Sequence, residues 1–128
     1  MLERHDPPTV CPPFSNYTNG IEVPAGARWL VVSGQVGSDV SGRPAEGFEA
    51  QCRQVFANIG AVLASAGMGL EDIVKVGVFL TRAADVPIYR RVRDEILPAR
   101  TASSLVIVAG LVSPDLLVEI EAYAAKAD

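Results

Sequence analysis

The sequence predicts an α+β protein, a two-layer domain in the order ββαβαββ whose two helices cover one face of a mixed sheet. One observation behind this prediction is an amphipathic pattern over residues 48–66, typical of a long helix. A second is a set of short segments rich in β-branched residues before and after that helix. The third is size, because 128 residues, 49% of them hydrophobic, are enough for one core and no linker divides them. We therefore expect one domain over residues 1–128.

The N-terminal part is expected to contain an irregular arm, a β-hairpin and the long helix. Residues 1–15 include four prolines, which block helix formation and weaken strand pairing, so we expect them to form an irregular arm. Residues 17–23 and 28–36 are β-rich and flank turn residues, which predicts two paired strands. The long helix should bury its apolar stripe and end at Gly67.

The second half is expected to add a strand, a helix and two further strands. Residues 73–81 are rich in β-branched and aromatic residues and predict a buried strand. A second helix should begin at Asp85, as N-cap, and end near Leu97, before Pro98. Residues 102–108 and 116–124 predict the last two strands. The second helix should bury Ile88, Tyr89, Val92 and Ile96, and expose Arg90, Arg91, Arg93, Asp94 and Glu95.

Side chains alternate between the two faces of a strand, so each strand predicts its own core side. The residues suited to the helix-covered face are Leu30, Val32, Val36, Val74, Val76, Val78, Leu80, Val118, Ile120 and Ala122. Those on the opposite face are Trp29, Val31, Ser33, Gln35, Lys75, Gly77, Phe79, Leu117, Glu119, Glu121 and Tyr123. This second set is too apolar for a face in water, which favours burial between subunits of a closed oligomer over a monomer with an apolar surface.

Two carboxylates, Glu119 and Glu121, share that second face on an otherwise apolar strand. A covered carboxylate must accept hydrogen bonds, pair with a cation or take a proton, and these conditions make a carboxyl a useful acid or base. Glu119 is the candidate catalytic group, whereas a salt bridge or hydrogen bond that stabilises the oligomer is favoured for Glu121. Lys75 is a possible site cation, although an ion pair with either glutamate is the simpler interpretation.

Composition excludes several other classes of protein. A net charge of −4 with scattered basic residues argues against nucleic acid as a partner. No apolar run suggests a signal peptide or a membrane segment, so we expect a cytoplasmic protein. Cys11 and Cys52 have no metal-ligand spacing and are too few for a disulfide framework, and we expect neither a metal nor another cofactor. The single histidine, His5, lies in the arm, which disfavours serine nucleophile chemistry.

Several motifs in order resemble the RidA/YjgF family over residues 17–124. They are Tyr17-Thr-Asn-Gly20, Val32-Ser-Gly-Gln-Val36, Asn58-Ile-Gly60, Asp72-Ile-Val-Lys-Val76, Pro98-Ala-Arg100 and Val118-Glu-Ile-Glu-Ala122. The resemblance implies a chorismate-mutase-like fold and a homotrimer with small-molecule clefts between adjacent subunits. It also implies hydrolysis of reactive enamines and imines, such as 2-aminoacrylate and 2-iminopropanoate, to keto acids and ammonia without a cofactor.

The resemblance carries over most of the family's site. Tyr17, Ser33 and Gly34 match residues that line the cleft or contact ligand, and Glu119 matches the acid that positions water. The family's substrate-anchoring arginine is replaced by Ser103, eight residues before Leu111.

Arg100 stands three residues early, and its long side chain could bend into the cleft in place of the missing arginine or serve a solvated or interface role. A serine offers no charge for a carboxylate, so small imino acids should bind less well. Three functions remain open: a deaminase of enamines or imines that are larger or lack a carboxylate, a trimer that binds a small molecule without reacting, and a pathway-specific hydrolase or tautomerase.

Overall fold

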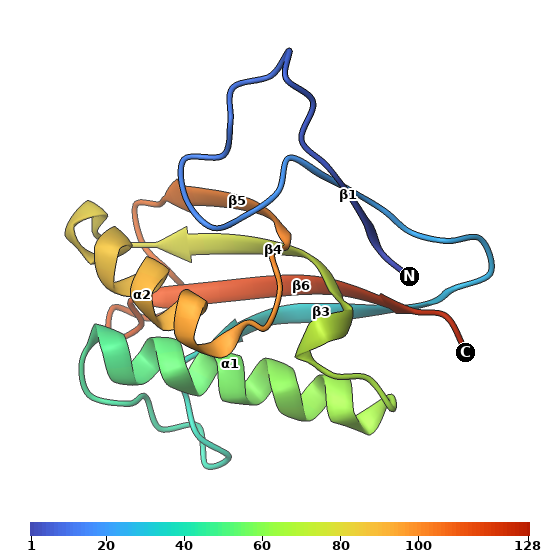
Figure 1. Ribbon diagram of the computed structural model, residues 1–128. Coiled ribbons are helices and arrows are strands. Elements are labelled where there is room, and N and C mark those ends of the chain that lie inside the picture. Colours follow the sequence, from blue (N-terminus) through green and yellow to red (C-terminus); the bar gives the residue numbers. More distant parts are fainter.

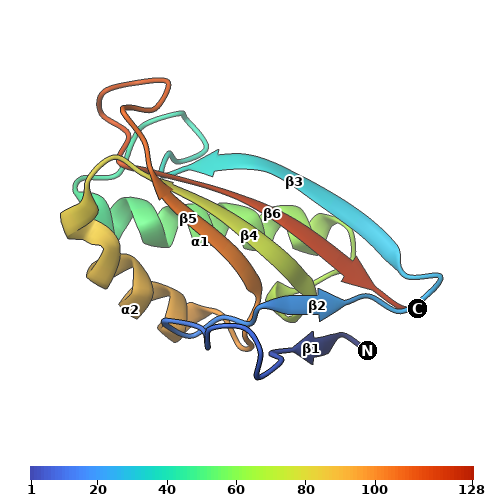
Figure 2. The same cartoon turned by 90° about the horizontal axis from the view of Figure 1, so that it is seen from above.

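A computed structural model describes residues 1–128, and its largest unit is a four-stranded sheet with two helices on one face (Figure 1). The strands lie in the order β3-β6-β4-β5, with β4 and β5 parallel and the other pairs antiparallel (Figure 2). The mixed sheet and two-layer α+β fold are therefore confirmed. The elements are β1 (Glu3–His5), β2 (Gly20–Glu22), β3 (Arg28–Val36), α1 (Phe48–Ser65), η1 (Leu70–Asp72), β4 (Ile73–Leu80), η2 (Ala83–Asp85), α2 (Val86–Ile96), β5 (Ala102–Ile107) and β6 (Val118–Lys126).

The expected N-terminal hairpin is wrong, because β2 pairs with β1 and β3 pairs with β6. The arm is accordingly not irregular throughout: residues 3–5 form β1, and the four prolines all lie after it. Asp6 fixes the end of β1 beside β2 by accepting hydrogen bonds from the Thr18 hydroxyl at 2.8 Å and the Asn19 backbone N–H at 2.7 Å. These contacts join residues that are 12 and 13 positions apart, and local strand propensity does not reveal them.

The core lies between the sheet and the apolar stripe of α1, as the sequence predicts. Nineteen buried residues form one cluster, which includes Val55, Ile59 and Leu63 of α1 and Val118 and Ile120 of β6. Val74 was expected to face the helices, and this expectation is wrong. The pairing of β4 with β6 shifts its register between Ile73 and Lys75. Ile73 joins the core cluster, whereas Val74 lines a hollow on the opposite face. None of the helices is both long and apolar enough to cross a membrane.

The buried Gln51 side chain of α1 holds the start of β6 in place. Its amide nitrogen donates to the carbonyls of Ala45 and Asp115, at 3.1 and 2.8 Å, and its oxygen accepts from the Leu117 N–H at 2.8 Å. A Cβ built on Gly37 would lie only 2.6 Å from the Cα of Gln51, so the end of β3 must carry glycine here. Through these contacts α1 sets the positions of β3 and β6, the two strands that carry Gly34 and Glu119.

Asp85 occupies the N-cap position of α2 but makes no capping bond. Its carboxylate instead accepts a hydrogen bond from Arg82 Nε at 2.7 Å. Helix α2 ends at Ile96, and this confirms the predicted end of the helix before Pro98.

Candidate functional site

The sheet face opposite the helices is open in the single chain and carries large apolar side chains. Trp29 is 55% exposed, Val31 is 66% exposed and Tyr123 is 39% exposed. Val31 and Tyr123 are directly paired across β3 and β6, and they form a continuous apolar surface there.

The two faces of the sheet therefore follow the predicted alternation, with three corrections. After the β3–β6 register shift Gln35 pairs with Ile120 and Val36 with Glu119, so the expected faces of Gln35 and Val36 are exchanged, and Leu117 packs against the core.

Glu119 and Glu121 lie on this open face of β6, each half-buried. No other side chain of the same chain donates a hydrogen bond to either carboxylate or forms an ion pair with it. The ion pairs of the chain all involve other residues. Both are half-desolvated acceptors on an apolar surface, which is a costly arrangement unless a ligand or a second subunit supplies donors.

Two glycines leave the space in which these carboxylates lie. A Cβ built on Gly34 would overlap Oε2 of Glu119 and lie 2.9 Å from its carboxyl carbon. A Cβ built on Gly77, which pairs with Glu121, would lie 2.9 Å from Cγ of that glutamate. The β3–β6 register shifts between Val32 and Gln35, and this irregularity leaves Ser33 and Gly34 without a partner residue in β6. The structure thus brings Gly34 and Glu119 together, with the exposed Ser33 next to them.

Lys75 shares a hollow of about 300 Å³ on the open face with Trp29, Glu121 and Tyr123. No ion pair forms between Lys75 and either glutamate, so that expectation is wrong for the single chain.

Tyr17 and Ser103 lie in a different place, a cavity of about 210 Å³ between residues 14–17, α2 and β5. Ser103 pairs in register with the core residue Val76, and so its side chain points to the helix side of the sheet. The Tyr17 hydroxyl accepts a 3.3 Å hydrogen bond from the Phe14 backbone N–H. We call this space the α2 cavity.

The expected site residues therefore form two groups that do not meet within one chain. Ser33, Gly34 and Glu119 lie on the open face around β3 and β6, and Tyr17 and Ser103 line the α2 cavity beside β5. Strands β3 and β5 are the opposite edges of the sheet (Figure 2). A site that contains both groups requires a second copy of the chain.

Arg100 belongs to neither group. Its Nη1 donates to Asp6 Oδ2 at 3.3 Å, and its carbonyl accepts from Arg4 Nε at 2.8 Å. The same Asp6 carboxyl has its pKa held below the usual value, mainly by the Asn19 N–H and then by the Thr18 hydroxyl and Arg100. Arg100 thus fastens the arm and does not line the α2 cavity.

Arg93, predicted to lie on the solvent face of α2, is instead a buried cation in the wall of the α2 cavity. The residue is 4% exposed, and its guanidinium carbon lies 5.7 Å from the centre of the Tyr89 ring. Its Nε donates to Asp94 Oδ1 at 3.0 Å and its Nη1 to the Ser15 hydroxyl at 3.3 Å. The signal was present in the spacing, because Arg93 follows the inward-facing Tyr89 by four residues, one helical turn.

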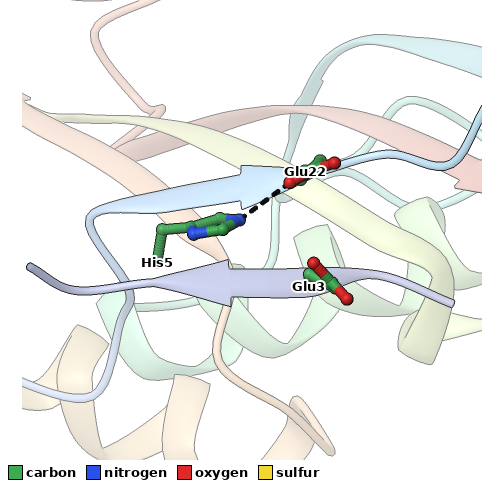
Figure 3. A group of neighbouring side chains, drawn as sticks. All are labelled: Glu3, His5 and Glu22. Atoms are coloured by element: carbon green, nitrogen blue, oxygen red, sulfur yellow. Dashed lines mark hydrogen bonds and ion pairs between the residues drawn. The ribbon is translucent and has the colours of Figure 1, made fainter.

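One group of side chains could offer three ligand atoms to a metal ion, namely Glu3, His5 and Glu22 on the β1–β2 ribbon (Figure 3). Their ligand atoms lie within 4.8 Å of one another, and all three side chains are exposed. His5 Nε2 lies 3.0 Å from Glu22 Oε1, so these two already satisfy one another. The group contributes no residue to either part of the expected site.

Comparison with known proteins identifies the family. The protein-family model described as Endoribonuclease L-PSP matches residues 9–126. A RutC family protein of Aquifex aeolicus is 39% identical over 70 residues, which are 54% of each chain. The 2-iminobutanoate/2-iminopropanoate deaminase of Salmonella typhimurium is 31% identical over 115 residues, covering 86% of this chain and 87% of that protein. The chain belongs to the RidA/YjgF family.

The structural comparison agrees with this assignment. The crystal structure of YyfB, a Rid family protein of unknown function from Yersinia pestis, matches with a TM-score of 0.86 and 29% identity over 98% of both chains. The RidA/YjgF fold expected from the sequence is therefore confirmed.

Proposed function

We propose that this RidA/YjgF protein hydrolyses the C=N bond of reactive imines, and of enamines through their imine tautomers, releasing ammonia. The observation that carries the proposal is the unpaired Glu119 carboxylate, half-buried on an apolar face with Gly34 leaving room beside it. The name of the Salmonella relative, an imine deaminase, supports the same reaction class.

The reaction needs proton transfer and a positioned water, and no redox change. Protonation of the imine nitrogen makes its carbon electrophilic, and water attacks that carbon while a carboxylate accepts the water's proton. The resulting carbinolamine expels ammonia as the C–N bond breaks and leaves a carbonyl, so imine plus water gives ketone or keto acid plus ammonia. Glu119 is the group proposed to accept and return the proton. We propose that a backbone N–H near Gly34, at the irregularity in β3, donates to the substrate.

We propose that the cleft lies between copies of the chain in a homotrimer. The two groups of site residues lie towards opposite edges of one sheet, so a head-to-tail contact would bring the β5 edge of one copy to the open face of the next. A ring of such contacts buries the apolar surface around Val31 and Tyr123. The number three follows from the family and not from the geometry of one chain.

Ser103 bears directly on which imines are accepted. It supplies no charge where relatives in the family carry an arginine, and so a carboxylated substrate needs another cation to anchor it. The same observation supports one alternative function, a trimer that holds a small molecule without reacting. A pathway-specific hydrolase or tautomerase would use the same cleft.

The family model's description, endoribonuclease, does not change the proposal. The sole histidine is paired with Glu22 on the β1–β2 ribbon, and the net charge of −4 disfavours a polyanionic substrate. We therefore propose a small molecule as the partner of the cleft, with no nucleic acid.

The test is ammonia release from freshly generated 2-iminopropanoate and from an uncharged imine of similar size. Glu119→Gln removes the proton acceptor but keeps the shape of the side chain, and should lower turnover by about 10²-fold or more. Glu121→Gln is the matched control on the same face and should retain turnover. Size measurement of both variants must show the same assembly as the wild type. Unchanged turnover in Glu119→Gln would refute its role, and no turnover of either imine by the wild type would favour the binding alternative.

A further inference from the structure

The β1–β2 ribbon brings three side chains that can bind a metal ion to one of its faces. Glu3 and His5 are two residues apart on β1, so they project to the same side of the strand. Glu22 of β2 is the direct partner of Glu3 in the antiparallel register, and Figure 3 shows His5 reaching across to it. The sequence does not reveal this group, because Glu22 follows His5 by 17 positions and joins it only through strand pairing.

The two carboxylates of this group oppose each other, which is unfavourable without a cation between them. Like charges at directly opposed positions destabilise an antiparallel pair, and a ribbon of two three-residue strands is itself marginally stable. Glu3 takes part in no ion pair of the chain, and Glu22 pairs with His5 alone. A divalent cation between the strands would remove the repulsion and satisfy Glu3.

The spacing of the donor atoms suits a transition-metal ion. His5 Nε2 lies 3.0 Å from Glu22 Oε1. Two donors bound tetrahedrally to one Zn²⁺ at about 2.0–2.1 Å lie about 3.3 Å apart, so these two atoms need to separate by only a few tenths of an ångström. The Glu3 carboxylate lies within 4.8 Å of both and needs to approach by roughly 1.5 Å at most. Rotation about the side-chain bonds of an exposed glutamate supplies that movement.

The backbone that carries these ligands is already held in place. Asp6 accepts hydrogen bonds from the Thr18 hydroxyl and the Asn19 N–H, which fixes the end of β1 beside β2. Arg4 Nε donates to the carbonyl of Arg100, and this bond ties β1 to the segment before β5. Metal binding therefore has to order side chains but not the chain itself, which lowers the entropic cost of binding.

We propose that Glu3, His5 and Glu22 bind a divalent transition-metal ion, for which Zn²⁺ is the probe, and that the bound ion fastens β1 to β2. One imidazole and two carboxylates suit zinc and its first-row neighbours, whereas Mg²⁺ and Ca²⁺ take oxygen ligands. His5 binds through Nε2 as a neutral ring that keeps its hydrogen on Nδ1, and its hydrogen bond to Glu22 is replaced. This site is independent of the proposed imine hydrolysis. The alternative is a surface hydrogen bond beside a solvated Glu3.

The test is a zinc titration followed by proton NMR. His5 is the single histidine of the chain, so its ring signals report on this site without ambiguity. The full chain is used without an affinity tag and with Cys11→Ser, because the exposed Cys11 thiol is also able to bind zinc. Zn²⁺ should shift or broaden the His5 ring signals until one ion is bound per chain. Mg²⁺ should leave them unchanged.

Glu3→Gln and Glu22→Gln test whether the three ligands act together. Each should weaken zinc binding by about tenfold or more, because the loss of even an outer partner of a metal ligand costs about 10–100-fold. Glu46→Gln is the matched control, since Glu46 is also exposed but lies outside the ribbon. Zinc should raise the unfolding temperature of the wild type but not of Glu3→Gln. Without metal, Glu3→Gln should be at least as stable as the wild type, because it removes the repulsion between the carboxylates.

Several results would overturn the proposal. Unchanged His5 signals at about a tenfold excess of Zn²⁺ would do so, as would an equal response to Mg²⁺. Zinc binding of wild-type strength in both Glu3→Gln and Glu22→Gln would show that His5 binds the ion without the carboxylates. A metal-free Glu3→Gln less stable than the wild type would show that Glu3 has another partner and carries no unrelieved repulsion.

Discussion

Gly34→Ala should disable Glu119 without unfolding the protein. The backbone at Gly34 has no positive φ, so alanine adopts it without strain, and the residue is exposed. The new methyl group would overlap the Glu119 carboxylate and lie 2.9 Å from its carboxyl carbon, whereas ordinary contact begins at 3.4 Å. The carboxyl carbon must therefore retreat by roughly half an ångström, and the nearer oxygen by more, which a flexible side chain does at little cost in stability.

The expected loss lies in catalysis. A displacement of about 1 Å at a reacting group costs about 10²-fold in rate, equivalent to about 2.7 kcal/mol of transition-state stabilisation. The assay is ammonia release from the better of the two imines, with thermal unfolding measured on the same preparations.

Gly77→Ala is the matched control, because its methyl group would crowd Glu121 in the same way, 2.9 Å from Cγ. Gly77→Ala should retain turnover. Equal turnover in both variants, or equal loss in both, would refute the assignment of Glu119 over Glu121.

Three further predictions concern the framework around the site. Gln51→Ala should lower the free energy of unfolding by about 2–4 kcal/mol in urea titrations, because buried backbone groups lose their partners, whereas Gln54→Ala should cost under about 1 kcal/mol. Val31→Glu should dissociate the oligomer into folded monomers in light-scattering measurements, whereas Val112→Glu, on an exposed loop, should not. Asp6→Asn should lower the unfolding temperature at neutral pH. Because hydrogen bonds lower the pKa of Asp6 below 3.8, the gap from wild type should be full above that pH and close as pH falls through the folded pKa.

Sequence patterns predicted those features that depend on local periodicity. The apolar stripe of α1 and the alternation along β6 determine which residues are buried, and these patterns need no knowledge of distant contacts. The open apolar face was predictable for the same reason, since it is the other half of the same alternation. The resemblance of the motifs to the RidA/YjgF family then predicted the particular fold.

The errors share a physical cause, which is that each depends on a contact distant in sequence or on a shift in register. Residues 3–5 pair with β2 because Asp6 binds Thr18 and Asn19, and no local pattern encodes that contact. The register shift at the start of β4 turns Val74 out of the core without any proline or glycine to mark it.

Arg93 was assigned to solvent because of its charge, although its position one turn after Tyr89 places it on the inner stripe. The Tyr89 ring and Ser15 offset part of the cost of burying that charge. The contact with Tyr89 follows from the spacing within α2, whereas Ser15 lies 78 positions away and is not visible from the helix alone.

The most direct test of the central claim, an imine-hydrolysing cleft shared between copies, is complementation between two inactive variants. Glu119→Gln and Tyr17→Ala each damage one of the two groups of site residues. The two variants, unfolded, mixed in equal amounts and refolded together, should form the proposed trimers, in which about a quarter of the clefts combine intact groups from different copies. Ammonia release at about a quarter of the wild-type rate, with each variant alone near zero, is the predicted result. A refolded mixture as inactive as its two components, in trimers of normal size, would contradict the account.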